Sequence, residues 1–202
     1  MKEAIDFLSE KEKIFQTIIE TFGVPNIPSR PQGFQTLVLL ILEQQVSIDS
    51  AKATFNKIKM QFPEMLPEQL AGVSVEDFRA LGVSRQKANY ISGLAQAVID
   101  KTIDLESLPH KPAEVVREEL IQLKGIGNWT IDIYLMFCLQ SPDIIPLGDI
   151  AVVNTIKELL DIHTREDMET LAQNWAPYRS MATYLLWHHY LNKRNRKIDY
   201  SL

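Results

Sequence analysis

Apolar residues recur every three to four positions along most of the chain, the spacing typical of amphipathic helices. Ile14, Ile18 and Phe22 illustrate it in the first segment. No segment shows convincing alternation of apolar and polar residues, the pattern typical of half-buried strands. The pattern therefore predicts an all-α protein of about ten helices. The predicted helices span residues 3–22, 34–45, 48–62, 74–81, 85–100, 112–123, 128–139, 149–160, 165–175 and 177–192.

Residues that favour helix ends stand at many of these boundaries. Ser47, Ser84 and Thr164 are predicted N-caps, because a hydroxyl there accepts a hydrogen bond from a free backbone N–H. Pro112 and Pro177 are predicted in first turns, where a missing N–H costs nothing. Three prolines between residues 25 and 31 predict a linker or crossover. Residues 34–45 are apolar nearly all round and predict a central, buried helix.

Composition narrows the class of protein. The chain has 202 residues, 46% apolar and 23% charged, as in an ordinary globular protein of one domain or two small ones. No apolar run approaches the roughly 20 residues of a membrane span, and the N-terminus lacks a signal-peptide core. We therefore expect a cytosolic, nucleoid-associated protein, or a nuclear one in a eukaryote.

The numbers of cysteines, histidines and charged residues bear on metal binding and on nucleic-acid binding. Cys138 is the single cysteine, so the chain cannot hold a four-cysteine iron–sulfur cluster. The four histidines are scattered and argue against zinc. The net charge of −5 argues mildly against nucleic acid. A local basic patch can still dominate the field at one face, and the candidate residues for it are Lys52, Lys57, Lys59, Arg85, Lys87 and residues 193–197.

A glycine turn joins the two helices predicted at 112–123 and 128–139. Gly125 and Gly127 flank Ile126, and Lys124 precedes them. Because glycine has no Cβ, backbone N–H groups can approach an anion closely, and a helix N-terminus favours negative charge. The turn therefore predicts a phosphate site, with Lys124 as a phosphate contact or a solvated charge. The alternative is a plain helix–helix turn.

This turn resembles the helix-hairpin-helix motif of the HhH-GPD superfamily of DNA glycosylases. Three further regions resemble the same family in the same order: EQQVSI at 43–48, IPLGDI at 145–150, and WAPYRSMA with LLW at 175–187. The last region resembles the 3-methyladenine DNA glycosylase II-like branch. Glu43 stands where many members have glycine, and Ile133 where some have a pocket tyrosine. Both departures bear on substrate range.

The resemblance implies two helical lobes that flank a DNA-binding cleft. One lobe would span 33–141 and carry the hairpin, and the other would combine 1–32 with 142–202. It also implies that Asp149 is the catalytic carboxylate, since breaking an N-glycosidic bond leaves an oxocarbenium-like sugar that a nearby negative charge stabilises. The plain alternative is that Asp149 caps the helix after it, and both roles are compatible.

The resemblance further implies the reaction type and the base site. Trp129 stands where bifunctional members carry a nucleophilic lysine, so water would be the nucleophile and an abasic site the product. Trp129, Trp187 and Tyr134 would line an aromatic pocket for a flipped, positively charged base, with core packing as the alternative. Gln45 would fill the gap that the flipped nucleotide leaves, and the alternative is that it is only a polar residue at a helix end.

The implied partner is damaged double-stranded DNA, bound by a monomer. No cofactor is expected except a structural Na⁺ or K⁺ at the backbone carbonyls of Ile121, Leu123 and Ile126. Two alternatives remain open at this point: a non-catalytic helix-hairpin-helix DNA-binding protein, and a helical interaction protein without a DNA role. The preferred lesion, among 3-methyladenine, 7-methylguanine, hypoxanthine and ethenoadenine, also stays open.

Overall fold

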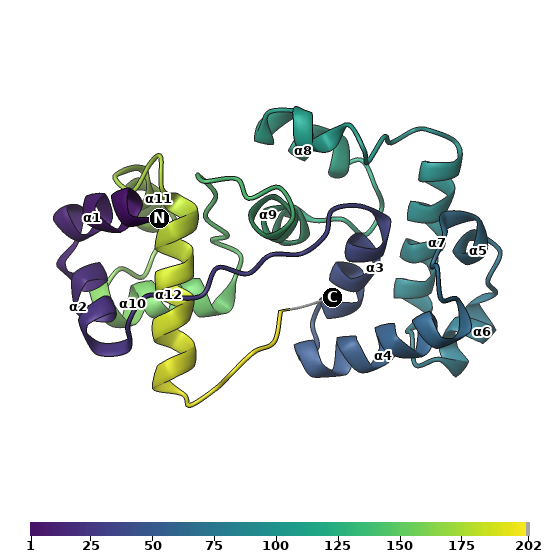
Figure 1. The fold of residues 1–202 in the computed structure, drawn as a ribbon, viewed down its shortest axis with the longest axis horizontal. Coiled ribbons are helices and arrows are strands. Elements are labelled where there is room, and N and C mark those ends of the chain that lie inside the picture. The colour runs from purple at the N-terminus through teal and green to yellow at the C-terminus, as the bar shows by residue number, and fades with distance from the viewer. Residues whose placement is uncertain (201–202) are drawn as a thin grey trace. The chain divides into compact units, whose positions relative to one another are not determined.

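A computed structural model describes residues 1–200, and no strand occurs within that range (Figure 1). The prediction of an all-α fold is confirmed. The helices are α1 (Lys2–Lys11), α2 (Lys13–Phe22), α3 (Phe34–Glu43), α4 (Ile48–Gln61), α5 (Pro67–Ala71), α6 (Val75–Ala80), α7 (Arg85–Ile99), the 3₁₀ turn η1 (Leu108–His110), α8 (Ala113–Leu120), α9 (Asn128–Phe137), α10 (Ile150–Leu160), α11 (Arg165–Gln173) and α12 (Arg179–Lys193).

The chain divides into two compact units. The terminal unit comprises residues 1–29 and 135–199, and the hairpin unit comprises residues 30–134 with Tyr200. The sequence predicted one lobe at 33–141 and a second lobe at 1–32 with 142–202. This prediction puts the boundary between the lobes after α9, whereas the two units of the structure divide within α9, between residues 134 and 135. Residues 201 and 202 of the predicted second lobe lie outside the described residues. Among the helices of residues 1–200, none is both long and apolar enough to cross a membrane.

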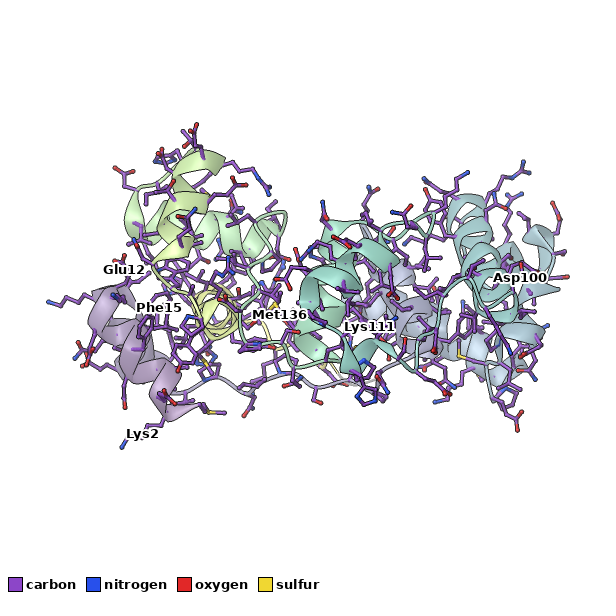
Figure 2. All side chains as sticks on the ribbon, turned by 90° about the horizontal axis from the view of Figure 1, so that it is seen from above. Lys2, Glu12, Phe15, Asp100, Lys111 and Met136 are labelled. Carbon is purple, nitrogen blue, oxygen red and sulfur yellow. The ribbon has the colours of Figure 1, made fainter. Side chains whose placement is uncertain are left out.

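In the terminal unit, α12 is the central helix and packs against α10, α2 and α1 (Figure 1). Residues 180–187 of α12 are all buried. The ring of Phe15 meets that of Trp175 edge to face, with centroids 5.2 Å apart, and Figure 2 shows Phe15 directed toward the other helices of its unit. Burial of these aromatic and aliphatic side chains is the main stabilising contribution to this unit.

In the hairpin unit, α3 is buried on nearly all sides and packs against α4 and α7. The prediction of a central, buried helix in this segment is confirmed. The short helices α5 and α6 cover α7.

Ser47, Ser84 and Thr164 are N-caps as predicted, and the side chain of each accepts a hydrogen bond from a backbone N–H three residues later.

Several predicted helix boundaries were wrong. Residues 3–22 form two helices, because the chain is extended at Glu12 and turns α2 so that it packs against α1. The helix predicted at 34–45 ends at Glu43. Pro112 is an N-cap residue rather than a first-turn residue, and Pro177 precedes α12, whose N-cap is Tyr178. The short elements α5 and η1 were not predicted, since neither is long enough to display a helical period.

Candidate functional site

Asp149 lies at the start of α10 in the terminal unit and caps this helix. Its Oδ1 atom accepts hydrogen bonds from the backbone N–H groups of Ala151 (2.9 Å) and Val152 (3.2 Å). The same oxygen accepts a third bond from the indole Nε1 of Trp187, at 3.0 Å. The carboxylate is only half-buried. The helix-capping role is therefore confirmed, and a negative charge is held in one orientation by three donors.

Trp187 is itself fixed by an aromatic cluster of the terminal unit. Trp187 is only 8% exposed. Its ring meets the ring of Phe137 nearly at right angles, with centroids 5.8 Å apart. Tyr184 lies 6.0 Å from the same ring and donates its hydroxyl hydrogen to the Met136 carbonyl at 3.1 Å. Burial strongly raises the pKa of the Tyr184 phenol, which keeps it neutral. Trp187 was predicted to line a base pocket, and in this structure its N–H holds Asp149.

The loop that leads to Asp149 is tied to the first turn of α12. Arg179 Nε and Nη2 donate to the two carboxylate oxygens of Asp143, at 2.7 and 2.8 Å. Burial alone would raise the pKa of Asp143, but the hydrogen bonds and charge of Arg179 lower it below its ordinary value. Ser180 Oγ donates to the Ser141 carbonyl (2.6 Å) and accepts from the Ile144 N–H (3.0 Å). With Trp187, α12 therefore holds both ends of the loop.

The two glycines of the hairpin serve different purposes. Gly125 has φ +92°, and a Cβ built there would lie 2.2 Å from the Tyr90 ring. A Cβ built at Gly127 would meet open space, with no atom of residues 1–200 within 4 Å. Ile126 is buried between them, and its N–H donates to the Leu123 carbonyl at 3.0 Å. Packing and backbone geometry thus require the first glycine, whereas the second leaves the start of α9 accessible.

Gln45 lies directly beyond α3 and is solvent-exposed. Its backbone has φ +58°, an uncommon conformation for a residue with a side chain. The neighbouring Gln44 joins this turn to the hairpin, because its Nε2 donates to the Gly125 carbonyl (2.8 Å) and to Thr130 Oγ1 (3.1 Å). The turn that presents Gln45 and the hairpin are therefore one connected structure.

Lys87 supports the same turn from α7. Its Nζ donates to the carbonyls of Leu42 (2.7 Å) and Gln44 (2.8 Å), and burial lowers the pKa of this ammonium group. From the sequence, Lys87 was one of several candidates for a local basic patch, and in the structure its ammonium group donates to backbone carbonyls of this turn instead. Sequence reasoning also missed the supporting role of Gln44.

A buried ion pair precedes the turn and was not predicted. Arg30 is 3% exposed and Glu43 6% exposed, and two hydrogen bonds of 2.6 and 2.9 Å join them. Arg30 Nε also donates to the Tyr200 carbonyl at 2.7 Å. A carboxylate at the end of the apolar run 37–42 is a sequence signal for a buried cationic partner, since an unpaired charge there would be costly.

The remaining predicted site residues lie in the hairpin unit. Trp129 is half-buried in the first turn of α9, and Lys124 is exposed. Tyr134 has no exposed surface, and its hydroxyl accepts the Gly33 N–H at 2.9 Å. The structure thus brings Asp149 together with Trp187, and the Gln45 turn together with the hairpin. A pocket shared by Trp129, Tyr134 and Trp187 stays a prediction.

Comparison with known proteins finds relatives that match most of this chain. The Bacillus subtilis protein YfjP is 31% identical over 76% of this chain, and the chain covers 58% of its length. DNA-3-methyladenine glycosylase 1 of Schizosaccharomyces pombe is 28% identical over 96% of this chain and 86% of its own.

Solved structures of DNA glycosylases have a similar fold. A crystal structure of a DNA-3-methyladenine glycosidase from Bacillus halodurans has a TM-score of 0.81 at 31% identity, and the match covers 94% of this chain and 89% of that one. The Schizosaccharomyces pombe glycosylase in complex with abasic DNA has a TM-score of 0.83 at 27% identity, covering 92% and 95%. Residues 38–180 match the HhH-GPD family, described as a superfamily of base excision DNA repair proteins. This chain therefore belongs to the HhH-GPD superfamily of base excision DNA repair proteins.

Proposed function

We propose that the protein is a monofunctional DNA glycosylase, acting as a monomer, that excises alkylated purines such as 3-methyladenine from duplex DNA and leaves an abasic site. The names of the relatives support this class of substrate. One observation carries the catalytic assignment: the half-buried Asp149 carboxylate is held by three N–H donors at the start of α10. A carboxylate held in this way is suited to charge stabilisation, because it needs no reorientation during the reaction.

The chemistry follows from the charges that develop. As the N-glycosidic bond breaks, positive charge gathers on the sugar, and Asp149 stabilises it or orients the attacking water. An alkylated purine already carries positive charge, so it leaves readily without a strong general acid. Trp129 and Trp187 are the proposed aromatic residues for this base, since an aromatic face attracts a cation. Tyr134, which has no exposed surface, is proposed to support this pocket from the core.

The absence of an amine at position 129 determines the proposed reaction type. The indole of Trp129 cannot form a Schiff base with the sugar, which is the step that leads to strand cleavage in bifunctional enzymes. Water is therefore the proposed nucleophile, and the strand stays intact. Lys124, which precedes the hairpin and is exposed, is proposed as a phosphate contact instead.

The hairpin and the Gln45 turn are proposed to hold the DNA. Gly127 leaves room for a phosphate to approach the backbone N–H groups at the start of α9. Gln45 is proposed to occupy the gap left by the flipped nucleotide.

A monovalent cation site is also proposed at the hairpin. The carbonyls of Ile121, Leu123 and Ile126 would hold Na⁺ or K⁺. The Leu123 carbonyl accepts one hydrogen bond, from Ile126, and this leaves it a second lone pair for such an ion. A cation there would add positive charge beside the phosphates.

The test is incubation with methylated duplex DNA, followed by chromatography of the released bases and electrophoresis of the strands. We expect free alkylated purines, intact strands until alkali or heat is applied, and no covalent complex after borohydride treatment. A borohydride-trapped complex would contradict the monofunctional assignment. Binding of the duplex without base release would instead support a non-catalytic helix-hairpin-helix protein, and the absence of both would support the interaction protein.

A further inference from the structure

A concave site lies beside the hairpin, within the hairpin unit. It is a surface pocket of about 380 Å³, formed where the first two turns of α7 meet the residue that precedes the glycine turn. The pocket is lined by Arg85, Gln86, Asn89, Tyr90 and Lys124. The sequence assigned Arg85 only to a general basic patch.

The charges of the pocket lack internal partners. Neither Arg85 nor Lys124 takes part in an ion pair within residues 1–200, and no carboxylate lines the pocket. By contrast, Arg30, Lys111 and Arg117 in the same unit are each paired with a carboxylate. Two unpaired cations that converge on one hollow raise its positive potential and favour an anion there.

The neutral lining residues are also suited to an anion. Gln86 and Asn89 each carry an amide NH₂ group, and Tyr90 carries a hydroxyl. Gln86 Nε2 donates to the Tyr90 oxygen at 2.6 Å, and a hydroxyl that accepts a hydrogen bond can still donate its own hydrogen. Arginine and lysine together with such donors are the groups that proteins use for phosphate oxygens.

Tyr90 connects the pocket to the hairpin. Its ring packs so closely on Gly125 that a Cβ there would lie 2.2 to 2.7 Å from three ring atoms. The same ring therefore lines the pocket and packs against the glycine turn.

We propose that this pocket binds a phosphodiester group of the DNA backbone, as a contact additional to the one proposed for the hairpin N–H groups. The proposal rests on the proposed function, because it takes duplex DNA as the partner. A phosphodiester is favoured over a base edge, because the pocket presents two full positive charges and no carboxylate. Arg85 and Lys124 would each donate to its oxygens.

The test is binding of an undamaged duplex by Arg85→Gln over a range of salt concentrations. We expect affinity to fall roughly tenfold at low salt, as for the loss of one charge-assisted hydrogen bond. The slope of log K against log salt should fall by about one. Lys101→Gln is the matched control, since Lys101 is exposed and lies just beyond the C-terminal end of α7, whereas Arg85 begins this helix of about 21 Å, at 1.5 Å per residue.

A duplex scan with single methylphosphonates locates the contact. Each methylphosphonate removes one backbone charge. At one position it should weaken binding to the wild type and to Lys101→Gln clearly more than binding to Arg85→Gln, in which only the charge of Lys124 remains at the pocket. The proposal is overturned if every methylphosphonate position carries the same penalty in Arg85→Gln as in the wild type, or if the salt slope of Arg85→Gln equals that of the wild type. Failure here leaves base release by the wild type intact, so it is distinct from failure of the proposed function.

Discussion

The indole Nε1 of Trp187 donates a hydrogen bond of 3.0 Å to Oδ1 of Asp149, although the two residues are 38 positions apart in the sequence. The bond joins α12 to the start of α10. The same helix, through Arg179 and Ser180 in its first turn, holds the beginning of the loop that ends at Asp149. The orientation of the proposed catalytic carboxylate therefore depends on α12 as well as on the first turn of α10.

Trp187→Phe tests this relationship. The variant keeps an aromatic ring in the cluster with Phe137 and Tyr184 but removes the N–H donor. We expect the single-turnover rate of base release to fall about tenfold, as for the loss of one hydrogen bond to a charged group. Affinity for a duplex with an abasic-site analogue should change little, since the proposed phosphate contacts lie in the hairpin unit.

Trp175→Phe provides the matched control for this substitution. Trp175 is fully buried in the same unit, and its Nε1 has no hydrogen-bond partner among residues 1–200, so its replacement should leave the rate unchanged and lower stability only through lost packing. Equal rate losses in the two variants would show that the effect comes from packing, and the positioning role of Trp187 would be lost.

The hairpin glycines should respond differently to alanine. Gly125→Ala places a Cβ against the Tyr90 ring at positive φ, so we expect a loss of about 2 kcal/mol or more in the free energy of unfolding. Gly127→Ala meets open space and should leave the melting temperature nearly unchanged while it weakens binding of damaged and undamaged duplex alike. Thermal melting and DNA binding of both variants check this, and unchanged DNA affinity in Gly127→Ala would remove the turn from the interface.

The Asp143–Arg179 pair should make stability depend on pH. The pKa of Asp143 is lowered in the folded state, so its pairing stabilises the fold above the unfolded-state pKa of about 3.9 and is lost as pH falls through the lower folded-state pKa. Asp143→Asn should therefore lower the melting temperature at neutral pH, and the difference from the wild type should shrink in acid. The exposed Asp6→Asn serves as the control, and a difference that persists at the lowest pH would contradict the ion-pair origin.

Local signals in the sequence predicted much of the fold. Ser47, Ser84 and Thr164 were recognised because an N-cap bonds to a backbone N–H only three residues away. Asp149 was recognised as a cap for the same reason. The buried face of α3 was visible as an uninterrupted apolar run, whose burial needs no knowledge of its partners.

The rest depended on partners distant in sequence. The end of α3 was misplaced, because Lys87 and Gln44 stabilise the non-helical turn through bonds to the Leu42, Gln44 and Gly125 carbonyls. Trp187 was predicted to be part of a pocket, and only the folded structure brings its N–H to Asp149. A helical period identifies which residues are buried, but it carries no information on which polar atom each will meet.

The most direct test of the account is the single-turnover rate of base release by Asp149→Asn on methylated duplex DNA. Asparagine keeps the size of the side chain and much of its capping capacity, so stability should fall by at most about 1 kcal/mol. Loss of the preorganised charge should lower the rate by on the order of 100-fold or more, while binding of an abasic-site analogue survives. A variant that melts normally, binds normally and releases base at nearly the wild-type rate would contradict the assignment of Asp149 as the catalytic residue.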